Sequence, residues 1–140
     1  MNNIRESVHD LYDESIDLHG EMQEVIEHFD FCAIDFQYDI SSNLDRKMKY
    51  SILAIQKEAL SNIIKHSNAT QCRIVFIEHP GLFQLLIEDN GTKKGSSDHT
   101  GIGTQNIRDR VSNLKGTLNI SNEKGYRIFI SIPKRNEADR

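Results

Sequence analysis

The segment from Arg46 to His66 constrains the fold most, because its apolar residues recur with the period of a long α-helix. The apolar positions that define one face of this helix are Met48, Ile52, Ile55, Ala59 and Ile63. A second set of side chains is polar and is spaced i, i+4, i+7 and i+8, so it shares one stripe of the helix. This polar stripe consists of Glu58, Asn62, Lys65 and His66.

The chemistry of the polar stripe suits a site for a metal ion and a polyphosphate. Carboxylate and amide oxygens can bind a hard cation such as Mg²⁺, and an ammonium group can meet a phosphate. An ordinary solvated helix face has a similar composition, however, and amphipathic helices are common. Taken alone, the stripe is better interpreted as a solvated face, and other segments have to decide.

The remaining segments show both strand and helix patterns. Alternation of apolar and polar residues from Cys32 to Asp39 predicts a half-buried strand. Two antiparallel hairpins are predicted over residues 72–88 and 117–132. Further helices are predicted over residues 3–19, 20–29 and 104–115, the last ending at Gly116. This order predicts an α/β (α+β) fold, a two-layer sandwich in which a mixed sheet of about five strands carries helices on one face.

Composition argues against several classes of protein. The chain has 140 residues, enough for one domain with its own core. Its net charge of −4 argues against a general nucleic-acid-binding protein, which is usually basic. No apolar run approaches the length of about 20 residues that a membrane-spanning helix needs. The two cysteines, Cys32 and Cys72, are predicted to be buried free thiols in a reducing compartment, without a metal or redox role.

Two glycine-containing segments follow the long helix. Asp89-Asn90-Gly91 ends a predicted strand, where the carboxylate can accept a hydrogen bond from an exocyclic amine and the glycine lets a flat ring approach. Gly101-Ile102-Gly103 precedes a predicted helix whose free N–H groups favour phosphate oxygens. Alone, the first is as well explained by a plain turn and the second by a flexible helix entry. Together with the polar stripe, they indicate a nucleotide site.

The same residues carry a family resemblance. The segments EALSNIIKHSNAT, IEDNG and GIGTQNIRDRVSNLKG resemble the N, G1 and G2 boxes of the GHKL ATPase superfamily. More narrowly, they resemble the ATP-binding domain of sensor histidine kinases of the nitrate/nitrite-sensor-like subgroup, of which N-x-R-x-R-V-x-x-L-x-G is typical. The resemblance covers residues 50–133 and implies the Bergerat (GHKL) fold. It implies a remnant of the second helix of a dimerisation domain over 1–19, the ATP-binding catalytic domain over 20–133 and a polar tail over 134–140.

The resemblance also implies roles for individual residues, with ATP and Mg²⁺ as cofactors. Asn62 would coordinate Mg²⁺, Glu58 would orient or activate the attacking group, and Asp89 would bind the adenine amine. The other nucleotide-binding positions would be Lys65, His66, Gly91, Gly101, Ile102, Gly103 and Thr104, with residues 92–100 as a lid. The implied chemistry is transfer of the γ-phosphoryl group to a histidine.

Two positions depart from the family pattern. Lys93 replaces the second glycine of the DNGxG motif, and Tyr126 replaces a threonine that would contribute a hydrogen bond beside the adenine. His9-Asp10 imitates the phosphoacceptor dipeptide but lies too close to the ATP-binding segments. The phosphoacceptor histidine is therefore expected outside this chain, and His9 is expected to be a surface histidine.

The resemblance implies partners as well. The expected partners are the protein's own dimerisation and phosphoacceptor domain, as a homodimer of the full-length protein, and a downstream response regulator. No direct nucleic-acid partner is expected, and the domain is expected to be cytoplasmic, linked to a membrane only through N-terminal segments outside this chain. Two alternatives remain open: a stand-alone GHKL serine kinase that sequesters a sigma factor, and a nucleotide-binding module without catalysis.

Overall fold

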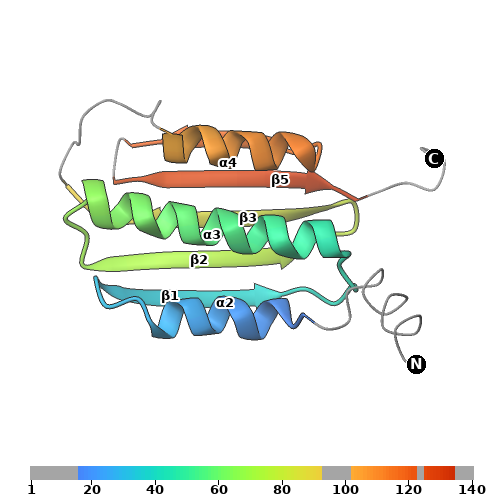
Figure 1. Ribbon diagram of the computed structural model, residues 1–140, viewed down its shortest axis with the longest axis horizontal. Helices are drawn as coiled ribbons and strands as arrows, with labels where there is room; N and C mark the ends of the chain where they lie inside the picture. Colours follow the sequence, from blue (N-terminus) through green and yellow to red (C-terminus); the bar gives the residue numbers. More distant parts are fainter. Residues whose placement is uncertain (1–15, 93–101, 123–124, 135–140) are drawn as a thin grey trace, which may run out of the picture.

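A five-stranded mixed sheet with helices packed against one face forms the described part of the chain (Figure 1). The computed structural model describes residues 16–92, 102–122 and 125–134. The elements are α2 (Leu18–Glu27), β1 (Ala33–Asp39), α3 (Arg46–His66), β2 (Gln71–Glu78), β3 (Leu82–Asp89), α4 (Ile102–Asn113), β4 (Thr117–Ser121) and β5 (Arg127–Pro133). The predicted strand, the two predicted hairpins and the long helix are confirmed, and so is the two-layer arrangement.

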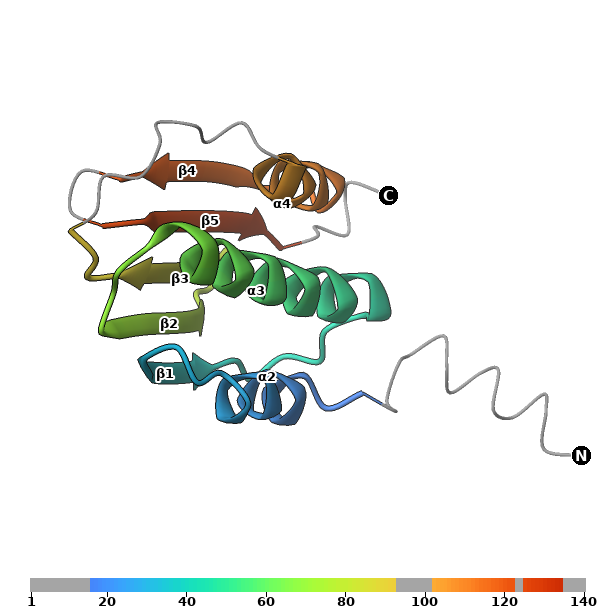
Figure 2. The ribbon, with the colours of Figure 1, turned by 60° about the vertical axis from the view of Figure 1, so that its left-hand side comes forward.

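The strand order is β1-β2-β3-β5-β4, with β1 parallel to β2 and the other three pairings antiparallel. A parallel pair needs a crossover connection, and α3 supplies it between β1 and β2. The long helix therefore lies across the middle of the sheet, between α2 and α4 (Figures 1 and 2).

The core lies between the helices and the covered face of the sheet. Alternate residues of each strand point into it, as the period of two in a β-strand requires. On β3 and β5 the core-facing side chains include Leu85, Ile87, Ile128 and Ile130, each with no exposed surface. Helix α3 contributes Ile52, Ile55, Ala59 and Ile63, four of the five positions that define its apolar face in the sequence.

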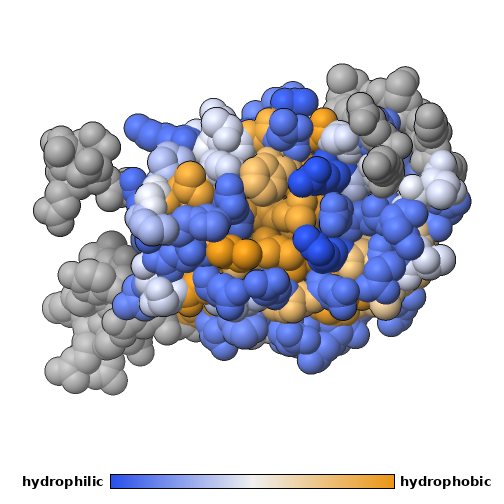
Figure 3. Space-filling model, turned by 180° about the vertical axis from the view of Figure 1, so that it is seen from behind, coloured by the Kyte–Doolittle hydropathy of each residue, from blue (hydrophilic) through white to orange (hydrophobic). Residues whose placement is uncertain are grey.

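The other face of the sheet has an apolar centre and a charged edge. Val75, Leu86 and Phe129 are direct neighbours across β2, β3 and β5. Glu88, two residues after Leu86 on β3, forms ion pairs with two arginines on the neighbouring strands. Its Oε2 lies 3.5 Å from Arg73 Nε, and its Oε1 lies 3.7 Å from Arg127 Nε. Figure 3 shows this face, where an apolar patch is surrounded by polar side chains. This face is covered by no helix of the described residues, so the domain has a single helical layer.

The helix boundaries depart from the predicted ones at two places. Helix α2 begins at Leu18, and this side chain is buried in the core, so the predicted boundary between residues 19 and 20 falls inside a helix. The part of the first predicted helix over residues 1–15 lies outside the described residues. Helix α4 begins at Ile102, earlier than the predicted start at Thr104.

The end of α4 differs from the predicted glycine stop. The residue with a left-handed backbone is Lys115, at φ 60°, and not Gly116. The Gly116 N–H donates to Val111 O and the Lys115 N–H to Ser112 O, both at 2.9 Å, which is the pattern of a Schellman motif. Gly116 is needed for another reason, because a Cβ there would lie 2.6 Å from Ser131 O of β5.

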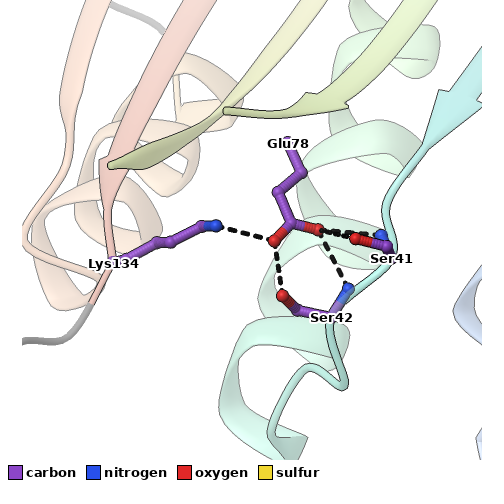
Figure 4. Close-up of polar contacts among 4 residues, drawn as sticks. All are labelled: Ser41, Ser42, Glu78 and Lys134. Carbon is purple, nitrogen blue, oxygen red and sulfur yellow. Dashed lines mark hydrogen bonds and ion pairs between the residues drawn. The ribbon is translucent and has the colours of Figure 1, made fainter. Parts of the chain in front are cut away.

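A polar cluster around Glu78 ties three segments together at the end of the sheet where α3 begins (Figure 4). The Glu78 carboxylate accepts hydrogen bonds from Ser41 N at 2.8 Å, from Ser42 N at 2.9 Å, from both serine hydroxyls and from Lys134 Nζ at 2.7 Å. The hydrogen bonds from Lys134 and Ser42, followed by Ser41, hold the pKa of Glu78 far below its ordinary value. Lys134 N also donates to Gly81 O, so this residue belongs to the domain and not to the predicted tail.

Replacing Glu78 should destabilise the domain, because Glu78→Gln removes the charge on which the Lys134 and serine hydrogen bonds converge. We expect the variant to lower Tm by several degrees at neutral pH. A carboxyl group with a depressed pKa contributes stability above its unfolded pKa and loses it as the pH falls. The difference in Tm between wild type and variant should therefore shrink below the ordinary carboxyl pKa of 4.5.

Glu88→Gln is the matched control, because Glu88 forms ion pairs with exposed arginines on the open face of the sheet, and such pairs contribute little to stability. Thermal unfolding followed by circular dichroism between pH 3 and pH 7 would measure both variants. Equal Tm values for Glu78→Gln and Glu88→Gln at neutral pH would contradict the proposed role of the cluster.

Candidate functional site

The end of β3 holds a buried carboxylate. Asp89 is 6% exposed, and its Oδ1 accepts hydrogen bonds from Gly91 N at 2.7 Å and from Tyr126 N at 3.3 Å. Its other oxygen, Oδ2, is buried without a hydrogen-bond partner among the described residues. Buried polar atoms are nearly always hydrogen-bonded in folded proteins. This oxygen is therefore a fixed acceptor for a donor that the described residues do not provide.

Two glycines allow the chain to pack closely around Asp89. Gly125 has φ 96°, and a Cβ there would lie 2.3 Å from Asp89 O. A Cβ on Gly91 would lie 2.5 Å from Ser67 Oγ and 3.0 Å from Asp89 Oδ1. The sequence predicts Gly91 as space for a base, and the structure shows that this glycine also lets the backbone close over the carboxylate.

Two asparagines to which the sequence analysis gave no role fasten the segment between α3 and β2 to the segment that follows β3. Asn90 Oδ1 accepts hydrogen bonds from Thr70 N at 2.9 Å and Gln71 N at 3.1 Å. Asn68 Oδ1 accepts one from Thr92 N at 2.9 Å. Asparagine is typical of turns because its side chain mimics a backbone group, and that signal could have identified both residues. They hold the polar stripe and Asp89 in a defined relative position.

The polar stripe of α3 divides between two surroundings. Glu58 and Asn62 are half-buried, whereas Lys65 and His66 are exposed in the last turn of the helix. Lys65 lines a hollow of about 600 Å³ between α2 and α3, together with Ser61 and Ile64. Lys65 therefore lies at the edge of the face of α3 that is turned toward α2.

Tyr126 connects the polar stripe to Asp89. Its backbone N–H donates to Asp89 Oδ1 and its carbonyl accepts from Asp89 N at 2.9 Å. The pKa of the Tyr126 hydroxyl is raised, and burial is the largest cause. The charges of Asp89 and Glu58 also raise it, whereas the neighbouring Asn62 amide and the charge of Arg108 lower it. The residues that shift this pKa belong to α3, β3 and α4, so Tyr126 lies near all three elements.

The start of α4 lies at the same end of the sheet as the C-terminal end of α3 and the end of β3 (Figure 1). Ile102 and Gly103 are in the first turn of α4, and Thr104 is buried. Helix N-termini carry free N–H groups that favour anions. The predictions for Gly101 and Lys93 lie outside the described residues, and so does His9. Of the lid predicted over residues 92–100, only Thr92 is among the described residues.

The residues present fit a magnesium–nucleotide complex better than a metal held by protein alone. No group of three or more His, Cys, Asp or Glu side chains in the described ranges could hold a metal ion. Magnesium commonly takes one or two protein oxygens together with substrate phosphates. Asn62 would supply such an oxygen, and Glu58 lies one turn earlier on α3.

None of the helices in the described part of the chain has the length and apolar character to cross a membrane.

Comparisons with known proteins point to one family. The chain is 33% identical over 103 residues to the signal transduction histidine-protein kinase/phosphatase UhpB of Salmonella typhimurium, covering 73% of this chain and 20% of that protein. It is 33% identical over 97 residues to the nitrate/nitrite sensor protein NarQ of Escherichia coli, covering 66% of this chain and 17% of that protein. The chain thus spans about a fifth of the length of each of these two relatives. No family model matches the chain.

A solved structure shares the fold. The histidine kinase domain of a blue-light activated histidine kinase from Erythrobacter litoralis EL346 superimposes with a TM-score of 0.71 at 18% identity, covering 86% of this chain and 63% of that one. The likeness confirms the predicted fold, a five-stranded mixed sheet with helices on one face.

Gly125 is the position where the close packing around Asp89 can be tested. Gly125→Ala combines a left-handed backbone with a contact of 2.3 Å to Asp89 O, so we expect it to lower the free energy of unfolding by about 2 kcal/mol or more. Gly81→Ala is the matched control, because a Cβ there meets nothing within 4 Å, and it should change the value by less than about 0.5 kcal/mol. Urea unfolding would measure both, and equal values would contradict this packing.

Proposed function

Because the chain carries a GHKL-type ATP-binding domain of the sensor histidine kinases, we propose that it binds Mg-ATP and transfers the γ-phosphoryl group to a histidine of a separate phosphoacceptor domain. The observation that carries this proposal is the buried Asp89 carboxylate, with one oxygen held by two backbone N–H groups and the other without a partner among the described residues.

Asp89 explains a preference for adenine. The exocyclic amine of adenine is a donor and can fill the missing partner of Asp89 Oδ2, whereas guanine presents a carbonyl acceptor at the same ring position. Two backbone donors fix the carboxylate, so it cannot turn away to suit another base. We therefore infer that the site binds ATP in preference to GTP.

The phosphates would lie between α3 and the start of α4. Asn62 would coordinate Mg²⁺ together with phosphate oxygens, and the ion would neutralise negative charge on the β- and γ-phosphates. Glu58, one turn earlier, would orient or activate the incoming histidine. Lys65 and His66 would meet the nucleotide from the last turn of α3, and the phosphates would be closed in by the amides of Gly101, Ile102, Gly103 and Thr104.

Tyr126 would make this site differ from others of its family. Asn62, the residue proposed to bind Mg²⁺, lies close enough to its hydroxyl to lower the pKa of that group. An amide lowers the pKa of a phenol by donating its N–H, so the Asn62 oxygen would stay available for the ion. Lys93 and Tyr126, the two departures from the family pattern, motivate the alternative of a nucleotide-binding module without catalysis, which the kinase assay tests.

The proposed partners follow from the reaction. A phosphohistidine formed on the dimerisation and phosphoacceptor domain would pass its phosphoryl group to a response regulator, as in two-component signal transduction. One named relative is a signal transduction histidine-protein kinase/phosphatase and the other is a nitrate/nitrite sensor protein, which favours this function over a stand-alone serine kinase that sequesters a sigma factor.

Calorimetry with Mg-ATP tests the role of Asp89. Asp89→Asn removes the charge from the adenine acceptor, and loss of one hydrogen bond to a charged group should weaken Mg-ATP binding by about 10-fold to 100-fold. Asp35→Asn is the matched control, because Asp35 is exposed on the edge strand β1, and it should bind as wild type does. Absence of binding to the wild-type chain at millimolar Mg-ATP would refute the proposal.

The kinase reaction tests Glu58. The chain is mixed with a separately expressed phosphoacceptor domain and labelled ATP, and acid-labile phosphohistidine is expected on that domain. Glu58→Gln should reduce the rate by about 100-fold, the usual contribution of one acid–base group, while Mg-ATP affinity changes little. Acid-stable phosphoserine on an anti-anti-sigma partner would support the serine kinase, and nucleotide binding without any transfer would support the non-catalytic module.

A further inference from the structure

The two cysteines of the chain lie next to each other in the structure. Cys32 Sγ and Cys72 Sγ are 3.0 Å apart, although 40 positions separate the residues in sequence. Both are free thiols, and either can donate to the other. A disulfide bond is about 2.0 Å long, so the two sulfurs need to approach by only about 1 Å to form one. The sequence predicted two buried thiols without a redox role, and it contained no sign of their contact.

The sheet explains why the thiols meet. Strand β1 runs parallel to β2, with Ile34 paired to Cys72, and Cys32 lies two residues before Ile34. Cys32 precedes the first residue of β1, and both Cys32 and Ile34 pack against the core cluster that contains Cys72. The contact is therefore produced by the register of the parallel pair that α3 connects, and it lies where the edge strand β1 begins.

The two thiols differ in access. Cys32 is half-exposed, whereas Cys72 is 1% exposed. Burial raises the pKa of Cys72, and its hydrogen bond with Cys32 and the nearby Asp89 charge raise it further. The thiolate is the reactive form of cysteine, and a raised pKa makes it rarer at Cys72. Because Cys32 is also the more exposed thiol, an oxidant from solution reaches Cys32 first. A metal site is a poorer explanation, because no third ligand of the kinds that bind metals joins the pair within the described residues.

We propose that Cys32 and Cys72 are a redox-active pair that forms an intramolecular disulfide between β1 and β2. With a low-molecular-weight disulfide such as oxidised glutathione, the Cys32 thiolate attacks one sulfur and releases one glutathione thiol, leaving a mixed disulfide on Cys32. Cys72 then loses its proton and attacks the Cys32 sulfur, releasing the second glutathione thiol. The protein loses two hydrogen atoms and two electrons, and the glutathione disulfide is reduced to two thiols.

The position of the pair gives the cross-link a defined structural effect. Cys72 is paired with Asp89 across β2 and β3, so the disulfide forms one strand away from the carboxylate of the candidate site. It closes the chain between β1 and β2, which includes all of α3. A cross-link over a long loop restricts the unfolded chain, so the oxidised domain should be more stable than the reduced one.

Oxidation of the purified chain with oxidised glutathione tests the proposal. Mass spectrometry after alkylation should show a monomer that has lost two hydrogen atoms and carries no alkyl group, with peptides containing Cys32 and Cys72 joined. Thermal unfolding should show a Tm several degrees higher for the oxidised protein, returning to the reduced value after dithiothreitol.

Cys32→Ser and Cys72→Ala are the matched variants. Each should give only a mixed disulfide or a disulfide-linked dimer through its remaining thiol, with no oxidant-dependent rise in Tm. Cys32→Ser retains the buried Cys72 and serves as the control if Cys72→Ala fails to fold. Two alkylatable thiols in the wild-type chain after oxidation, or only intermolecular dimers, would overturn the proposal. Neither readout involves nucleotide, so failure here and failure of the kinase proposal are distinguishable.

Discussion

The hydrogen bonds that hold Asp89 are the interaction on which the candidate site depends. The carboxylate lies at the end of β3, the central strand of the sheet, and two backbone N–H groups from different segments hold one of its oxygens. The segment that donates from Tyr126 can come this close because residue 125 is a glycine. A buried carboxylate is costly unless hydrogen bonds compensate for lost hydration, so this carboxylate holds β3 and the start of β5 together.

The two ends of the sheet are built differently. At one end, the Glu78 carboxylate has donors from Ser41, Ser42 and Lys134, and the segments before α3 and after β5 are tied together. At the other end, the Asp89 carboxylate keeps an oxygen without a partner among the described residues. A carboxylate with its donors in place contributes to stability, whereas one with an acceptor left over can bind a ligand. The same chemical group thus stabilises the fold at one end and defines the candidate site at the other.

The polar stripe of α3 illustrates what the tertiary structure adds to a helix pattern. Glu58 and Asn62 lie near Tyr126, whereas Lys65 lines the hollow beside α2. Asn68 and Asn90 set the distance between this helix and β3 by binding the backbone on the far side of the gap. The polar stripe can contribute to the candidate site only because these contacts hold α3 beside the end of β3, where Asp89 lies.

The sequence by itself determined the type of each main element, since apolar periods of 3.6 and 2 report burial directly. It also singled out Asp89 and Asn62 as candidate site residues, and their roles stay predictions. It did not contain the Cys32–Cys72 contact, the role of Lys115 in ending α4 or the donors around Glu78. The cysteine contact and the donors around Glu78 depend on which segments are neighbours and in what register, and local patterns do not encode pairing between distant segments. The left-handed backbone of Lys115 leaves Gly116 free of the role of ending α4, and Gly116 is instead set by its close approach to Ser131 O of β5. Only the tertiary structure decided that the buried oxygen of Asp89 is left without a partner among the described residues, because its neighbours come from three separate parts of the chain.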